Sequence, residues 1–120
     1  MNTSKTFLVV DDDPIFRGHM TLLLTKLGYH VIESSSGLGV NELVTREKPV
    51  ACLIDLVMAE REGIETIMEL RSRPDCPKLI AASSNPMYLS MVEPMGVDAI
   101  LHKPVSQERL QTTLDQLFPA

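Results

Sequence analysis

Three adjacent carboxylates, Asp11, Asp12 and Asp13, follow an apolar run in the stretch LVVDDDP. Like charges this close raise the cost of ionising each one, so the cluster needs a structural or chemical reason. A fourth carboxylate, Asp55, and a cation, Lys103, also follow short apolar runs. Carboxylates that meet a lysine and a hydroxyl are suited to holding a divalent cation and a phosphoryl group. A carboxylate can also attack phosphorus and form an aspartyl-phosphate.

Whether these groups meet depends on the elements that carry them. Five short apolar runs are nearly continuous rather than alternating, as in strands buried on both faces of a parallel sheet. These runs are Phe7–Val10, Val31–Ile32, Ala51–Ile54, Leu79–Ala82 and Ala99–Leu101. The amphipathic stretches between and after them are Pro14–Leu27, about Leu38–Glu47, about Ile64–Arg71, Asn85 to near Gly96, and the residues after Ser106. This fivefold alternation of strand and helix predicts a doubly wound α/β fold with right-handed crossovers.

Ligands in such folds bind beyond the carboxyl ends of the strands. Asp11–Asp13 follow the first predicted strand, Asp55 the third, Ser83 and Ser84 the fourth, and Lys103 the fifth. All of these groups are therefore expected at one edge of the sheet. Ser83 is the better hydroxyl candidate because it directly ends its apolar run.

Composition excludes several other classes of protein. The chain has 120 residues, which suffices for a core without disulfide or metal staples. Its net charge of −5 disfavours direct nucleic-acid binding, which requires a basic face. The N-terminus lacks the apolar stretch of a signal peptide, and no run is long enough to span a membrane. Cys52 and Cys76 lack metal-type spacing and favour reduced thiols. We therefore expect a single cytoplasmic domain without a membrane partner.

Several segments resemble the receiver domains of two-component response regulators. They are LVVDDDP (8–14), LIDLVM (53–58) with Gly63, LIAASS (79–84) and Lys103–Pro104, which together span nearly the whole chain. The resemblance implies a flavodoxin-like, five-stranded parallel sheet in the order 2-1-3-4-5 with helices on both faces. It implies one receiver domain over residues 1–120. The final Leu117–Ala120 resembles the start of a linker and favours a fragment of a longer regulator.

The resemblance also assigns a role to each site residue. It implies that Asp55 is the phosphoacceptor. It implies that Asp11 and Asp12 hold Mg²⁺ together with Asp55, and that the backbone carbonyl of Val57 is a further metal ligand. It also implies that Ser83 is the switch hydroxyl and that Lys103 pairs with the phosphate. Asp13 is then mainly a helix cap. Such a domain catalyses its own phosphorylation and dephosphorylation rather than turning over a substrate.

The resemblance further implies the partners of the domain. The phosphoryl group would come from a sensor histidine kinase or a histidine phosphotransfer protein. Phosphorylation would switch a surface formed by the helix that begins at Pro86, the strand Ala99–Leu101 and the helix after Ser106. A second copy or an output domain would dock there.

Two other functions fit part of the pattern. Asp11-Asp12-Asp13-Pro14-Ile15 loosely resembles the Asp-x-Asp start of haloacid-dehalogenase-like phosphatases, in which Asp11 would be the nucleophile and Asp13 the acid–base group. A chain of 120 residues leaves little room for the cap and further acidic motif of such an enzyme. A degenerate receiver that acts only as a binding module is the third alternative, and the complete set of site residues argues against it.

The sequence departs from the receiver pattern at four places. Ala59 follows Met58 where proline is common, and Glu62 stands where aspartate is common. The segment between Ser83 and Gly96 is short and contains Pro94, so its helix is expected to be abbreviated or irregular. Ile100 occupies the place of a common aromatic switch residue, so switching is expected to involve the loop before this helix rather than a ring flip.

Overall fold

A computed structural model of the chain describes residues 5–58 and 63–119. Ala59 and Glu62 lie outside the described residues. The strands are β1 (Thr6–Val10), β2 (His30–Ser34), β3 (Ala51–Asp55), β4 (Lys78–Ser83) and β5 (Ala99–His102). The helices are α1 (Pro14–Lys26), α2 (Val40–Glu47), α3 (Gly63–Arg71), α4 (Pro86–Val92), the 3₁₀ turn η1 (Glu93–Met95) and α5 (Gln107–Leu117).

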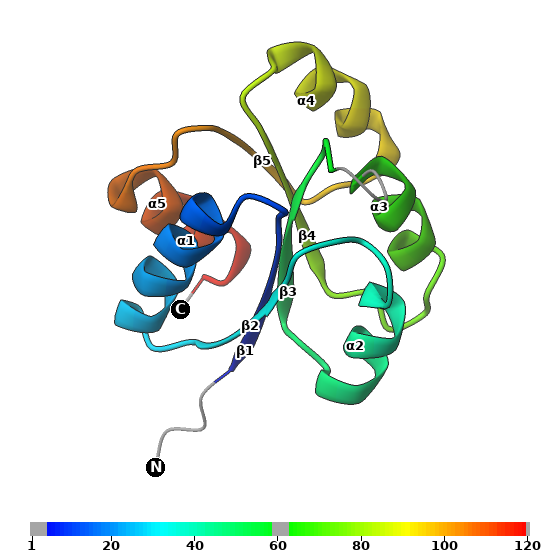
Figure 1. Ribbon diagram of the computed structural model, residues 1–120, viewed down its shortest axis with the longest axis horizontal. Coiled ribbons are helices and arrows are strands. Elements are labelled where there is room, and N and C mark those ends of the chain that lie inside the picture. The colour runs from blue at the N-terminus through cyan, green and yellow to red at the C-terminus, as the bar shows by residue number, and fades with distance from the viewer. Residues whose placement is uncertain (1–4, 59–62, 120) are drawn as a thin grey trace.

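The five strands form one sheet in the order β2-β1-β3-β4-β5. Every neighbouring pair is parallel. Helices α1 and α5 cover one face of the sheet, whereas α2, α3 and α4 cover the other (Figure 1). The predicted doubly wound fold and its strand order are therefore confirmed.

The central strands are buried on both faces, which explains their continuous apolar runs. The helices on each face close one of two apolar clusters. Beneath α1 and α5, the helical members are Phe16, Met20, Leu23, Leu24, Leu110 and Leu114. Beneath α2, α3 and α4, they are Val40, Val44, Ile67, Leu70, Leu89 and Val92. Cys52 is fully buried in the second cluster, as expected for a small apolar side chain.

Capping residues fix where the helices begin. The Asp13 side chain accepts a hydrogen bond from the backbone N–H of Ile15 at the start of α1, as its place before proline predicts. Helix α2 begins at Val40 rather than at Leu38. Gly39 has φ +79°, a left-handed conformation that ends the preceding turn and that a side chain would disfavour.

Helix α4 is short and irregular, as the sequence predicts. Asn85 caps its start by accepting a hydrogen bond from Met87 N–H at 2.9 Å. Regular helix ends at Val92, and η1 replaces the next turn because Pro94 has no N–H to donate. The chain then returns to the sheet through Gly96, which has φ +91°.

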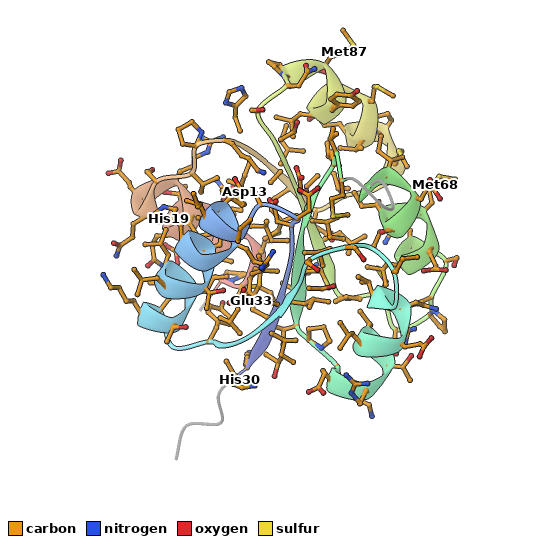
Figure 2. The ribbon with its side chains drawn as sticks, viewed as in Figure 1. Asp13, His19, His30, Glu33, Met68 and Met87 are labelled. Atoms are coloured by element: carbon orange, nitrogen blue, oxygen red, sulfur yellow. The ribbon has the colours of Figure 1, made fainter. Side chains whose placement is uncertain are left out.

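Figure 2 shows Asp13 near the carboxyl ends of the strands and His30 at the opposite end of the molecule. His19 lies on α1, and its Nε2 is 3.3 Å from the carbonyl oxygen of Val105.

Among the described residues, no helix combines the length and apolar character needed to cross a bilayer.

Candidate functional site

The site lies at the carboxyl edge of the sheet, where backbone pairing continues just beyond the strands. Asp11 N–H donates to the carbonyl of Ser34 at 3.0 Å, which extends the pairing of β1 with β2. Lys103 N–H donates to the carbonyl of Ser83 at 2.9 Å, which extends the pairing of β4 with β5. These bonds fix the backbone beneath the functional side chains, so that the side chains start from rigid elements.

Three carboxylates predicted to meet do so. Asp11, Asp12 and Asp55 each offer one oxygen atom, and these oxygens lie within 4.8 Å of one another. Asp11 is fully buried, Asp55 is 7% exposed and Asp12 is exposed. Asp13 stands apart in function because its side chain caps α1. The cluster therefore consists of two buried acids and one at the surface.

Lys103 supplies the positive charge of the cluster. Its Nζ donates to Asp11 Oδ2 at 2.8 Å and lies 3.3 Å from Asp55 Oδ1. The other oxygen of Asp11, Oδ1, accepts a hydrogen bond from Asp13 N–H at 2.9 Å. Both oxygens of Asp11 are thus engaged, and Asp55 shares the same ammonium.

Ser83 lies at the end of β4 and is 3% exposed. Its Oγ accepts a hydrogen bond from Asn85 N–H at 3.0 Å. Within the described part of the chain, the hydroxyl makes no hydrogen bond to the carboxylates. Its proton remains available because a serine hydroxyl donates one hydrogen bond while accepting others. Ser84, the neighbour, is exposed.

The environment of Asp55 disfavours its charged form. Burial raises its pKa, and the negative charge of Asp11 raises it further. Lys103 and the backbone N–H of Val57 act in the opposite direction. The result is a pKa of about 6, against an ordinary value of 3.8. A group that binds next to Asp55 and brings positive charge would relieve this cost.

This pKa predicts a pH dependence of stability in the metal-free protein. The folded state holds the Asp55 proton more tightly than the unfolded chain, so stability falls as the pH rises from about 4 through about 6. The free energy of unfolding falls by at most about 3 kcal/mol over this range. Asp55→Asn should remove this fall, so that the variant becomes progressively more stable than wild type across this window. Urea unfolding without divalent cations at several pH values would measure the difference, and parallel pH profiles would contradict the prediction.

A second layer of contacts, not predicted from the sequence, holds the acidic loop. Arg17 Nη1 donates to the backbone carbonyl of Asp11 at 2.7 Å, and Arg17 Nε donates to Glu33 Oε1 at 2.9 Å. Thr21 Oγ1 donates to the other oxygen of Glu33 at 2.8 Å. The only sequence signal is the placement of an arginine near the amino end of a helix, which the helix dipole disfavours.

Gly63 brings α3 against the end of β3, which carries Asp55. Gly63 N–H donates to the carbonyl of Leu56 at 3.2 Å. A Cβ atom at Gly63 would lie 2.8 Å from the carbonyl carbon of Asp55 and 2.9 Å from Leu56 Cα, and closer still to the Asp55 carbonyl oxygen. Only glycine permits this approach, which explains the residue at the start of α3.

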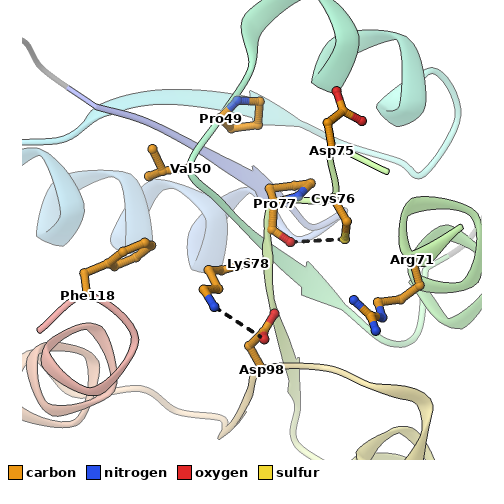
Figure 3. A pocket seen from close by; sticks show the side chains of 9 residues that line it. All are labelled: Pro49, Val50, Arg71, Asp75, Cys76, Pro77, Lys78, Asp98 and Phe118. Carbon is orange, nitrogen blue, oxygen red and sulfur yellow. Dashed lines mark hydrogen bonds and ion pairs between the residues drawn. The ribbon is translucent and has the colours of Figure 1, made fainter. Parts of the chain in front are cut away.

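A pocket at the amino ends of β3 and β4 is separate from the acidic site. It has a volume of about 480 Å³, and its lining includes Arg71, Lys78, Asp98 and Phe118 (Figure 3). Lys78 Nζ lies 4.0 Å from Asp98 Oδ1 across it. Because this pocket opens at the opposite edge of the sheet, it contributes nothing to the carboxylate cluster.

Comparison with solved structures supports the fold. The chemotaxis protein CheY4 of Vibrio cholerae matches with a TM-score of 0.86 at 20% identity, covering 97% of this chain and 100% of that chain. The receiver domain of the sensor histidine kinase PA1611 from Pseudomonas aeruginosa PAO1, solved with a magnesium ion in its active site cleft, matches with a TM-score of 0.84 at 23% identity. That match covers 95% of this chain and 97% of the other.

Sequence comparison identifies the family. The transcriptional regulatory protein GlrR of Escherichia coli K12 is 33% identical over 90% of this chain and 25% of its own length. The response regulator MprA of Mycobacterium leprae is 30% identical over 92% of this chain and 50% of its own length. The chain thus spans a quarter to a half of these two relatives. Residues 7–115 match the family model described as the response regulator receiver domain. The chain therefore belongs to the receiver domain family of two-component response regulators.

Proposed function

We propose that this domain accepts a phosphoryl group on Asp55 from the phosphohistidine of a sensor histidine kinase or a histidine phosphotransfer protein. One observation carries the proposal: three carboxylates and the Lys103 ammonium converge at the carboxyl edge of the sheet. In the transfer, a carboxylate oxygen of Asp55 bonds to phosphorus, the bond between phosphorus and the imidazole nitrogen breaks, and the imidazole leaves. We place this reaction in the cytoplasm.

The donor set fits Mg²⁺, which we propose as the cofactor. The three acids offer only oxygen atoms, which is the ligand type that Mg²⁺ takes. The raised pKa of Asp55 reflects burial and the negative charge of Asp11, and a divalent cation would offset both. We assign Asp12 and Asp55 to direct contact, Asp11 to a contact through water and the carbonyl of Val57 to a further ligand. Bound Mg²⁺ would supply positive charge beside the phosphoryl oxygens.

The remaining site residues act on the phosphoryl group through charge and hydrogen bonds. Lys103 already lies 3.3 Å from an oxygen of Asp55, so its ammonium needs little movement to pair with a phosphoryl oxygen attached there. The Ser83 hydroxyl, whose oxygen accepts from Asn85, keeps a proton to donate to another phosphoryl oxygen. Catalysis then consists mainly of positioning and charge neutralisation.

Neither alternative function is favoured. A phosphatase nucleophile at Asp11 would have to attack from a fully buried carboxylate whose two oxygens already accept hydrogen bonds. A degenerate receiver would be expected to lack one of the groups that the chemistry requires. Asp55, Asp12 and Lys103 instead occupy one cluster.

We further propose that phosphorylation changes the surface of α4, β5 and α5, where a second copy or an output domain docks. Ser83 connects the site to Asn85, the capping residue of α4, through a hydrogen bond. Ile100 on β5 is partly buried against the cluster beneath α4, so a change at Ser83 reaches this surface through packing rather than through a ring flip.

¹⁹F NMR with the phosphoryl mimic BeF₃⁻ tests whether the site binds a phosphoryl group. Wild-type protein should give bound ¹⁹F resonances in the presence of Mg²⁺ and none in its absence. A Lys103→Met variant should bind the mimic more weakly because the pairing cation is lost. Absence of bound resonances from the folded wild-type protein at millimolar Mg²⁺ would favour a binding module instead.

The assignment of Asp12 predicts a specific loss of metal response. A ligand that binds only the folded state at ten times its Kd stabilises it by about 1.4 kcal/mol. For a domain of this size, that equals roughly 5 °C in Tm. Asp12→Ala should lose most of this Mg²⁺-induced shift, because one of the three carboxylates of the cluster is gone.

Asp13→Ala provides the matched control for this measurement. It removes a neighbouring carboxylate and the cap of α1, so its metal-free Tm should fall, yet its shift on adding Mg²⁺ should match that of wild type. Differential scanning calorimetry with and without millimolar Mg²⁺ measures all three proteins. An equal shift in wild type and Asp12→Ala would remove Asp12 from the metal site.

A further inference from the structure

The ammonium of Lys103 has a third neighbour besides the two carboxylates. Its Nζ lies over the ring of Phe16, 4.1 Å from the ring centroid. The same atom is 2.8 Å from Asp11 Oδ2 and 3.3 Å from Asp55 Oδ1. A cation at this distance from an aromatic face is attracted by the ring quadrupole. Two acids and one aromatic face thus surround the charge.

The ring of Phe16 is held in place by the fold. Phe16 lies in the first turn of α1, is 9% exposed and belongs to the cluster beneath α1 and α5. Val105, two residues after Lys103, is part of the same cluster. The side chain of Lys103 is only 18% exposed. Cation–π attraction is stronger where water is largely excluded, so this contact is well placed to matter.

We infer that Phe16 is a positioning residue for Lys103, and that its aromatic face holds the ammonium at the site while the ammonium exchanges partners. This inference rests on the proposed function, in which Lys103 pairs with a phosphoryl group on Asp55. To make that pair, the ammonium has to give up part of its contact with Asp11. The ring remains beside the charge before and after the exchange.

An aromatic face suits this task better than a third acceptor atom. It attracts the positive charge without requiring one N–H to point in one direction, so the three N–H groups can turn from a carboxylate to a phosphoryl oxygen. A third carboxylate would instead compete with the phosphoryl group for the ammonium. An aliphatic side chain of similar size would fill the space but would leave the charge without attraction on that side.

Aliphatic and aromatic replacements separate this role from simple packing. Phe16→Leu and Phe16→Met keep most of the buried volume and remove the π face, whereas Phe16→Tyr keeps the face. The initial rate of Asp55 phosphorylation by acetyl phosphate, at saturating Mg²⁺, should fall about fivefold in both aliphatic variants, as expected for a cation–π contact of this kind. The tyrosine variant should stay within twofold of wild type.

A second readout needs no phosphodonor. The ring current of Phe16 should shift the NMR signals of the Lys103 εCH₂ protons upfield in wild type and in Phe16→Tyr, and the shift should vanish in Phe16→Leu and Phe16→Met. Mg²⁺ affinity, measured by calorimetry, should change less than twofold in all variants because the carboxylates remain.

The outcomes separate failure of this inference from failure of the proposed function. Folded aliphatic variants that are labelled as fast as wild type, or a tyrosine variant as slow as the aliphatic ones, would overturn the role of Phe16 while leaving Asp55 as phosphoacceptor. Wild-type protein that takes no label while its εCH₂ shift is present would overturn the proposed function and this inference with it.

Discussion

Asp55→Asn is expected to reduce Mg²⁺-dependent labelling by acetyl phosphate to background. Asparagine occupies the same space but has no anionic oxygen that can attack phosphorus. The variant should fold, and at pH 7 it should be more stable than metal-free wild type, because the buried charge with its raised pKa of about 6 is gone. Labelling is measured with radioactive acetyl phosphate after acid quenching.

Asp13→Asn is the control for charge in the same stretch of sequence. It removes one negative charge two residues from Asp11, and asparagine caps a helix about as well as aspartate. Its labelling should therefore remain close to that of wild type. Persistent Mg²⁺-dependent labelling of Asp55→Asn would show that another residue accepts the phosphoryl group.

Gly63→Ala is expected to destabilise the domain by about 3 kcal/mol or more, which corresponds to a fall in Tm of roughly 10 °C. The added methyl group would collide with the backbone of Asp55 and Leu56, and backbone atoms cannot turn aside as a side chain can. Relief requires α3 to move away from β3 or the backbone of Asp55 and Leu56 to shift. We therefore also expect slower labelling of Asp55 in whatever fraction remains folded.

Gly18→Ala is the matched control for a glycine in a helix. A Cβ atom at Gly18 would have no neighbour within 4 Å, and Gly18 lies inside α1. Alanine there should stabilise the domain by about 0.5–1 kcal/mol through helix propensity alone. Urea unfolding measures both variants. A Gly63→Ala protein as stable as wild type would mean that α3 does not pack on Asp55 as closely as described.

The parts of the site that were predictable from the sequence are those that sheet topology places. Asp11, Asp55, Ser83 and Lys103 each follow an apolar run, and parallel strands bring such positions to one edge whatever their separation in sequence. The irregular end of α4 was also predictable, because Pro94 removes a backbone donor regardless of its surroundings.

The remaining features depend on tertiary contacts that periodicity does not encode. Arg17 and Glu33 pair across two different elements, and Phe16 looks like an ordinary core residue until its ring is seen beneath Lys103. Gly63 matched the family pattern, but the reason for glycine is the close approach of α3 to the Asp55 backbone, which is a tertiary contact. The predicted start of α2, about Leu38, lies two residues before the observed start at Val40. The reason is that a glycine in the left-handed conformation cannot be distinguished from a helical glycine by sequence alone.

Locating the phosphoryl group chemically tests the central claim most directly. Borohydride reduction of acetyl-phosphate-treated protein converts an aspartyl-phosphate to homoserine, and peptide mass spectrometry then identifies the residue that changed. We predict homoserine at position 55, formed only when Mg²⁺ was present during labelling. Homoserine at position 11, 12 or 13, with Asp55 unchanged, would contradict the account.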